Sequence, residues 1–247
     1  MMFMQLWITE WMKIRRSWLP FLLIIGPVAG ILIGISNFLA NQEVFIKGPD
    51  SNEWLEAWTQ VQLFYASIIF PVLVSIMSAI VCRSEHISGG WKQLLALPVS
   101  RSSVYLTKLM VVAVLIALMQ VMLLSAYIAV GSMLFHSTLP IQQMLRFIIL
   151  GWLAALPLSA MQMIVSVRFI SFGLPLAINI ACTLPVVIVV NSTAGQYYPW
   201  ALPALAMSPE DESPIQSYPL FYAIVIGVLL ISVLIGVRSF EHKDSVG

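Results

Sequence analysis

Charged side chains are scarce in this chain of 247 residues, and their scarcity limits what the protein can be. Asp, Glu, Lys and Arg make up 9% of the residues, whereas about 25% is usual for soluble domains, and 60% of the residues are hydrophobic. Twelve basic and eleven acidic side chains are too few to cover a soluble fold of this length, and the net charge of +1 disfavours nucleic-acid binding. The composition excludes a soluble or disordered chain and predicts one that is solvated mostly by lipid.

Cysteine and histidine are also rare. Cys82 and Cys182 lie in apolar surroundings, and two cysteines provide neither a disulfide framework nor a metal-ligand spacing. The histidines, His86, His136 and His242, all lie outside the centres of the apolar segments. An intramembrane enzyme needs paired catalytic groups at membrane depth. We therefore predict no catalytic residue and no metal site, with an intramembrane enzyme as the less favoured alternative.

Long apolar segments, in contrast, are abundant. A helix that spans a bilayer needs about 20 mostly apolar residues, and lipid satisfies no backbone group, so such segments are best interpreted as helices. Six segments qualify, at residues 18–40, 57–82, 109–135, 147–167, 169–190 and 218–237. The sequence predicts an all-α membrane protein with six transmembrane helices in one domain over residues 1–247. The first segment is longer than the core of a signal peptide, which favours an uncleaved anchor.

The positions of the basic residues predict the orientation, because cytoplasmic loops are enriched in Lys and Arg. With both termini inside, the outer side carries only Lys47 and Arg146. The inner side then carries Lys13, Arg15, Arg16, Arg83, Lys92, Arg101, Lys108, Arg168, Arg238 and Lys243. We expect an N-in, C-in topology, with Arg168, Ser171 and Gly173 at a tight turn between the fourth and fifth helices.

Residues 1–17 have the pattern of an amphipathic helix. One face carries Met4, Trp7, Trp11, Ile14 and Trp18, and the opposite face carries Gln5, Thr9, Lys13 and Arg16. Such a helix is expected to lie in the inner headgroup plane. It either takes part in the mechanism, through Trp7, Trp11, Lys13, Arg15 and Arg16, or is a plain membrane anchor.

The loop from Arg83 to Lys108 is the longest predicted cytoplasmic connection. Gly89 and Gly90 permit a sharp turn, Trp91, Leu94 and Leu95 give a short apolar stripe, and Pro98 ends it. Ser100, Ser102 and Ser103 are candidate N-caps for the third span. We predict a short helix with an apolar face that lies against the inner membrane surface or binds a cytoplasmic partner.

Two further patterns concern the outer loop and the first span. The outer loop 191–217 has an apolar first half that is too rich in proline to span, with Tyr197, Tyr198, Pro199, Trp200 and Pro203. It is either a re-entrant element that dips into the outer leaflet or an ordinary interfacial loop. Gly26, Gly30 and Gly34 form a ridge of small residues, which either packs helices within one subunit or forms a dimer seam.

The loop between the second and third spans resembles that of ABC-2-type permeases, the membrane subunits of ABC transporters. The residues that match are Glu85, Gly90, Lys92, Leu94, Leu95, Pro98, Val99, Ser100, Arg101 and Lys108. The six spans, the amphipathic N-terminus and the Pro-Trp element before the last span agree with this family. Within it, the size and the YPWALP segment are similar to the permeases of lantibiotic and bacitracin self-protection exporters.

The resemblance implies a mechanism and partners. Residues 90–97 would form a coupling helix seated on a separate ATPase, with Glu85, Gly90, Trp91, Leu94, Leu95, Pro98, Arg101 and Lys108 as the coupling residues. The N-terminal helix would be the connecting helix, and the segment around residues 197–205 the re-entrant outer element. The chain has no G-x-x-x-x-G-K-[ST] motif, so ATP and Mg are expected on two copies of the partner ATPase.

The expected function is that of a permease in an ATP-driven exporter in a bacterial cell membrane. A second permease subunit, identical or related, would complete the pathway. The spans contain few polar groups, mainly Gln120, Gln162, Asn179 and Thr183, and lack the buried charges of a proton relay. An amphipathic peptide, antibiotic or lipid-like substrate fits such a pathway. A sensor or scaffold subunit of a peptide-detecting complex is the alternative.

Overall fold

The computed structural model describes residues 2–46, 48, 51–87, 89–91, 99–210 and 213–242. Within these residues the secondary structure is entirely helical. Five helical segments are long and apolar enough to cross a membrane: Leu19–Ala40 (α2), Glu53–Ile87 (α4, η1 and α5), Arg101–Leu134 (α7), Ile141–Arg168 (α8) and Tyr218–Glu241 (α12). The prediction of an all-α, multi-pass membrane protein is confirmed.

Most spans extend beyond the apolar segments that predicted them. The helix α7 has 34 residues, or about 51 Å at 1.5 Å per residue, whereas the hydrocarbon core of a bilayer is about 30 Å thick. Its N-cap is Ser100, whose Oγ accepts a hydrogen bond from the Ser103 backbone N–H at 3.2 Å, as the sequence predicted. The N-cap of α4 is Asn52, whose side-chain oxygen accepts a hydrogen bond from the Trp54 N–H at 2.9 Å.

The second span contains a π-helical turn in its middle. An α-helical part, Glu53–Phe64 (α4), is followed by a π-helical turn, Tyr65–Ile69 (η1), and then by Phe70–Ile87 (α5). Pro71, which has no backbone N–H to donate, lies just after the π-helical turn. The turn is buried: Tyr65, at its start, has no solvent-exposed area.

The fifth predicted span, at 169–190, is not one long helix. It consists of Gly173–Thr183 (α9) and Val186–Val189 (α10), with Leu184 and Pro185 between them. Together these residues form an apolar stretch of about 25 Å at helical rise, shorter than the five long spans. The helix breaks at Pro185 because the proline cannot donate the hydrogen bond that would continue the ladder.

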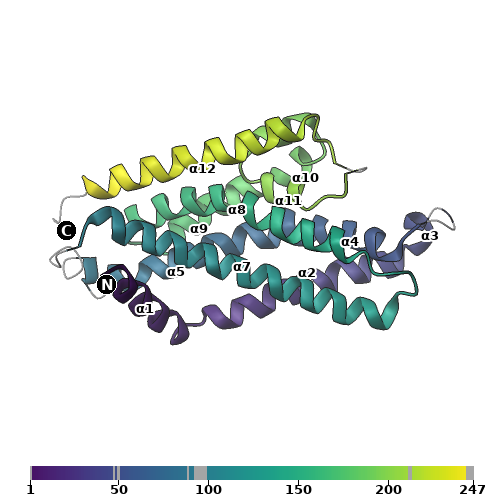
Figure 1. The fold of residues 1–247 in the computed structure, drawn as a ribbon, viewed down its shortest axis with the longest axis horizontal. Helices are drawn as coiled ribbons and strands as arrows, with labels where there is room; N and C mark the ends of the chain where they lie inside the picture. Colours follow the sequence, from purple (N-terminus) through teal and green to yellow (C-terminus); the bar gives the residue numbers. More distant parts are fainter. Residues whose placement is uncertain are drawn as a thin grey trace.

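The remaining elements are short. They are Met2–Arg15 (α1), Gln42–Phe45 (α3), Thr193–Tyr197 (η2) and Leu202–Ala206 (α11). Figure 1 shows α1, the last turns of α5 and the last turns of α12 at one end of an elongated bundle, with α3, the start of α4, α10 and α11 toward the other. We name these the inner end and the outer end, after the sides that the basic residues predict.

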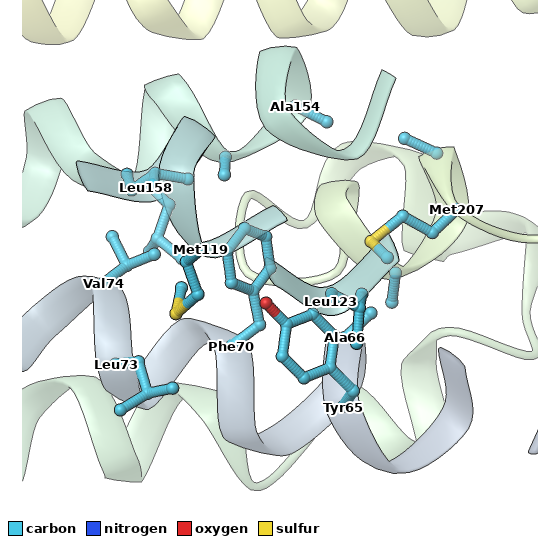
Figure 2. Close-up of a cluster of buried hydrophobic side chains, with 14 of the residues drawn as sticks. Tyr65, Ala66, Phe70, Leu73, Val74, Met119, Leu123, Ala154, Leu158 and Met207 are labelled. Carbon is cyan, nitrogen blue, oxygen red and sulfur yellow. The ribbon is translucent and has the colours of Figure 1, made fainter. Parts of the chain in front are cut away.

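The core runs along the bundle axis and is built from large side chains. Tyr65, Phe70, Met119 and Leu123 meet there, and Met207 from the outer segment reaches the same cluster (Figure 2). These residues come from η1, α5, α7 and the loop after α11. Burial of this apolar surface between the helices fixes how the spans pack.

The glycine ridge of α2 packs within the subunit. A Cβ on Gly26 would meet Leu73 at 2.1 Å, and a Cβ on Gly34 would meet the Val61 backbone at 2.5 Å. A Cβ on Gly30 would lie 2.8 Å from the Tyr65 side chain. The second span of the same chain fills the ridge, which favours the alternative of helix packing within one subunit.

Candidate functional site

Four charged side chains meet at the inner end, and we name them the four-charge cluster: Glu10, Lys13, Glu85 and Lys108. The Lys13 Nζ lies 2.8 Å from Glu10 Oε1 and 2.6 Å from Glu85 Oε1. The Lys108 Nζ lies 2.8 Å from Glu10 Oε2 and 3.0 Å from Glu85 Oε1. Each carboxylate therefore contacts both ammonium groups, and the charges alternate around the cluster.

The cluster connects three separate elements. Glu10 and Lys13 stand one turn apart on α1, Glu85 lies in the last turn of α5, and Lys108 lies in the second turn of α7. Only 1% of Lys108 and 2% of Glu85 are exposed, and Glu10 is buried as well. Charges so far from water are retained only when paired, so the cluster fixes α1 against the inner ends of the second and third spans.

Lys108 and Glu85 make further hydrogen bonds outside the cluster. The Lys108 Nζ donates a hydrogen bond to the Val81 carbonyl at 3.1 Å, and the Ser84 hydroxyl donates to Glu85 Oε2 at 2.7 Å. The burial of Lys13 opposes its charge, but the hydrogen bonds and negative charges of Glu10 and Glu85 outweigh burial and raise the pKa of the Lys13 ammonium. Two carboxylates and two ammonium groups balance one another, so the four-charge cluster has no net formal charge.

Trp91 joins the cluster to the start of the predicted coupling loop. Its ring lies 5.7 Å from the Lys108 Nζ, in cation–π geometry, and its Nε1 donates to His86 Nδ1 at 3.2 Å. On its other side the ring packs edge-on against Phe240 of α12, with 5.3 Å between centroids. The turn before Trp91 uses Gly89 at φ +64°, a conformation that glycine adopts without strain.

The other predicted coupling residues are placed as follows. Gly90 is helical together with Trp91, and Arg101 begins α7, where its guanidinium donates to the Glu241 carbonyl at 2.7 Å. Leu94, Leu95 and Pro98 lie outside the described residues. Of the predicted coupling set, the structure therefore brings Glu85, Trp91 and Lys108 together.

The N-terminal helix forms as predicted, but its faces differ from the prediction. Trp7 and Trp11 stack on one another with 6.4 Å between centroids and are half-buried, and Arg15 and Arg16 are exposed. Lys13, expected on the solvent face, points into the protein toward Glu85, because α1 also packs on α7. The helix lies on protein as well as near the predicted membrane surface.

Glu10 is the cluster member that sequence reasoning missed. A signal was present in the spacing: Glu10 stands three residues after Trp7 and four before Ile14, so it lies on the apolar stripe of α1. A carboxylate on a buried stripe requires a cationic partner. Lys13, one turn away, and Lys108, on another helix at the same predicted membrane side, both supply this positive charge.

At the outer end, the predicted re-entrant residues split between surface and core. Tyr197 is exposed, Tyr198, Pro199 and Trp200 are half-buried, and Pro203 is buried with the whole of 201–207. The Tyr198 hydroxyl donates to the Cys182 carbonyl at 2.5 Å. We name residues 201–207 the outer plug.

Neutral hydrogen bonds hold the outer plug against α4. The Trp58 Nε1 donates to the Met207 carbonyl at 2.9 Å, and the Gln62 Nε2 donates to the Ala204 carbonyl at 2.8 Å. The Trp58 ring is fully buried and stacks on Phe147 of α8 at 5.7 Å between centroids. The outer plug is therefore packed between helices.

Between the two ends, the polar side chains bond to one another and to backbone carbonyls. The Gln162 Nε2 donates to Ser75 Oγ at 2.8 Å, and the Thr183 hydroxyl donates to the Asn179 carbonyl at 2.9 Å. In the part of the chain that the structure describes, no group of three or more His, Cys, Asp and Glu residues could hold a metal ion.

The comparison with known families finds a match over most of the chain. The family model described as ABC-2 family transporter protein matches residues 6–186, which include the four-charge cluster, the loop between the second and third spans and the glycine ridge. No curated protein matches the chain in sequence. Since the family match covers most of the chain, the protein belongs to the ABC-2 transporter family and is a membrane permease of an ABC transporter, a subunit of the kind that works with a separate ABC ATPase.

Proposed function

We propose that this chain is the permease of an ATP-driven exporter of a bacterial cell membrane, with an amphipathic peptide, an antibiotic or a lipid-like molecule as its substrate. The observation that carries the coupling part is the four-charge cluster. It ties α1 to the two helix ends that flank the loop 88–100, so a force applied at that loop acts on α1, α5 and α7 together.

In this proposal, ATP and Mg bind to two copies of a partner ATPase, and residues 90–97 form the coupling helix that docks on it. Trp91 transmits the displacement, because its ring lies over Lys108 and against Phe240 of the last span. The exposed Arg15 and Arg16 on α1 offer a second contact surface beside the loop. A second permease subunit, identical or related, completes the translocation pathway.

The sixth membrane crossing in this proposal is 173–189. The helix α8 ends at the inner end and α12 begins at the outer end, so the chain must return between them (Figure 1). The apolar stretch broken at Pro185 makes this return, with both termini in the cytoplasm. Its last residues lie beside the outer plug, which we interpret as the re-entrant element that closes the outer end.

The substrate class is inferred from the polar groups inside the bundle. The side chains of Gln162, Asn179 and Thr183 are neutral and hydrogen-bonded within the protein, so they do not favour a small ion or a sugar. A largely apolar surface suits a molecule that partitions into the membrane. Self-protection against a lantibiotic or a similar peptide is a role that fits this class.

Copurification tests the coupling proposal. The chain is isolated from native membranes in mild detergent, and the ATPase that accompanies it is identified and quantified. We expect a Trp91→Asp, Leu95→Asp double variant to lose most of that ATPase, because two carboxylates would replace the apolar face of the docking helix. A matched Gln142→Asp, Gln143→Asp variant adds the same two charges to exposed positions at the outer end.

The matched variant should retain the ATPase at the level of the unmodified chain. Full copurification with the Trp91→Asp, Leu95→Asp variant would show that the loop is not the docking element. Normal ATPase binding together with no export of any peptide would instead favour the sensor or scaffold role.

A further inference from the structure

A cavity of about 290 Å³ opens at the inner end, between the last turns of α8 and α12, and we name it the α8–α12 cavity. Its apolar walls are Ile164, Val167 and Phe240, and its polar lining is Arg168, Ser239 and His242. Tyr105 of α7, which is 1% exposed, lies beside them. Among the residues that the structure describes, no Asp or Glu lines this cavity.

Backbone carbonyls at the two helix ends already accept hydrogen bonds from the protein. The carbonyls at the C-terminus of a helix carry a partial negative charge, which would oppose an anion. At the end of α8, the Ser166 carbonyl accepts from the His86 Nε2 at 3.0 Å. At the end of α12, the Arg238 carbonyl accepts from the His242 Nδ1 at 2.9 Å, and the Glu241 carbonyl accepts from a guanidinium of α7 at 2.7 Å. Donors of the protein therefore offset the negative ends of these helices.

The donors of the lining, in contrast, are mostly unused. The guanidinium of Arg168, with five N–H groups, and the Ser239 hydroxyl make no hydrogen bond or ion pair with the residues that the structure describes. His242 uses its Nδ1 on the Arg238 carbonyl and keeps its Nε2. Glu241, the acidic residue in the last turn of α12, lies outside the lining. A lining with a positive charge, unused donors and no carboxylate selects an anion.

The cavity lies at the level of the predicted inner headgroup layer. Arg168 ends α8 and His242 follows α12, whereas Ile164 lies about one turn, or about 6 Å, deeper along α8. Leu234 and Ile235, about two turns deeper on α12, are more than half exposed, as expected of a surface that faces lipid. Basic pockets between spans on the cytoplasmic side bind the headgroups of anionic lipids. An anion with an apolar tail therefore fits this position better than a free anion.

We propose that the α8–α12 cavity binds the phosphate group of an anionic phospholipid of the inner leaflet, with Arg168 at the phosphate and an acyl chain along Ile164 and Phe240. The inference goes beyond the proposed export function and does not depend on it. A lipid at this position would join the inner ends of α8 and α12. Since Phe240 also packs against Trp91, the lipid would hold the last span beside the start of the loop 88–100.

Native mass spectrometry of the purified chain in detergent micelles, without ATP, tests the proposal. The chain is titrated with phosphatidylglycerol, whose headgroup is anionic, and the lipid-bound fraction is measured. The comparison lipid is phosphatidylcholine with the same acyl chains, which keeps the apolar part and the phosphate but has no net charge. We expect phosphatidylglycerol to bind at least about tenfold more tightly, the effect of one charge-assisted hydrogen bond.

Two variants at exposed positions locate the site. Arg168→Gln removes the positive charge of the lining, and Ser239→Asp adds a carboxylate to it. Each should weaken phosphatidylglycerol about tenfold, the equivalent of one charge-assisted hydrogen bond, and leave phosphatidylcholine unchanged. The matched controls are Arg238→Gln and Ser102→Asp, which change the same charges at the inner end outside the lining. Both should bind phosphatidylglycerol as the unmodified chain does.

Equal affinity for the two lipids would overturn the site, and so would an equal loss in the matched controls, which would indicate a general attraction of anionic lipid to the inner end. Phosphatidylglycerol binding that survives in both Arg168→Gln and Ser239→Asp would overturn it as well. Displacement of the lipid by millimolar inorganic phosphate would show that the cavity takes a free anion instead. Since the measurement uses neither ATP nor the ATPase, its failure leaves the copurification result untouched.

Discussion

Different kinds of interaction attach α1 at the inner end of the bundle and the outer plug at the outer end. At the inner end, α1 is fixed by the four-charge cluster, in which three buried charges and the half-buried Lys13 meet at 2.6–3.0 Å. At the outer end, the outer plug is held by neutral donors, the Trp58 indole and the Gln62 amide, on backbone carbonyls. Both attachments join parts of the chain that are distant in sequence.

This difference predicts how the stability of each end responds to a substitution. Buried charges are strongly dependent on one another, because removal of one leaves its partners charged and without compensation. Neutral hydrogen bonds lose little more than their own contribution when one is removed. The inner end should therefore behave as an all-or-none attachment, and the outer end as a set of separate contacts.

The largest expected effect is that of Lys108→Met. This change leaves Glu10 and Glu85 with only Lys13, and we expect it to lower the free energy of unfolding by about 3–5 kcal/mol. Lys13→Met should cost less, since the Lys13 side chain is 35% exposed and Lys108 still contacts both carboxylates. Chemical unfolding in detergent micelles measures both, and equal stability of Lys108→Met and the unmodified chain would refute an all-or-none attachment.

Trp58→Phe should have an intermediate effect. It keeps an aromatic ring against Phe147 but leaves the buried Met207 carbonyl without its indole donor, at a cost of about 1–2 kcal/mol. The same unfolding measurement checks this value. A loss as large as that of Lys108→Met would mean that the outer plug is as cooperative as the inner attachment, and the contrast between the two ends would disappear.

The smallest effect is expected for Arg146→Gln. Arg146 pairs with Glu210 at the outer end, where the two side chains are 45% and 58% exposed. Water and salt screen such a pair, so its removal should change the free energy of unfolding by about 0.5 kcal/mol or less. An effect that persists in high salt would show that exposure does not separate this ion pair from the buried cluster.

The sequence predicted the structure best where interactions between neighbouring residues determine it. Runs of uncharged residues predict helices because lipid cannot satisfy the backbone, and all five long spans were identified on that basis. The helix ends were less accurate: α7 begins at Arg101 and not at residue 109, because the hydropathy pattern marks the hydrocarbon layer and a helix continues through polar turns beyond it. The break at Pro185 was missed because the spans were predicted from the absence of charge, and a proline within an apolar segment adds no charge.

The candidate site was predictable only in part. Glu85 and Lys108 were singled out by the resemblance of their loop to a family, and the structure places them 3.0 Å apart. That Glu10 and Lys13 would join them depends on how α1 packs on α7, a contact across almost a hundred residues that no local pattern encodes. The attachment of the outer plug to α4 depends in the same way on contacts between residues that are distant in sequence.

The arrangement of the cluster also determines how the Glu10–Lys13 pair on α1 responds to the membrane potential. Glu10 and Lys13 carry opposite charges on the same helix, so their joint displacement along the membrane normal transfers no net charge. The transmembrane voltage does work only on net charge that moves through it, about 2.3 kcal/mol per charge for each 100 mV. A shift of this pair is therefore insensitive to membrane potential, and residues that touch the cluster can displace the pair without moving net charge through the membrane field.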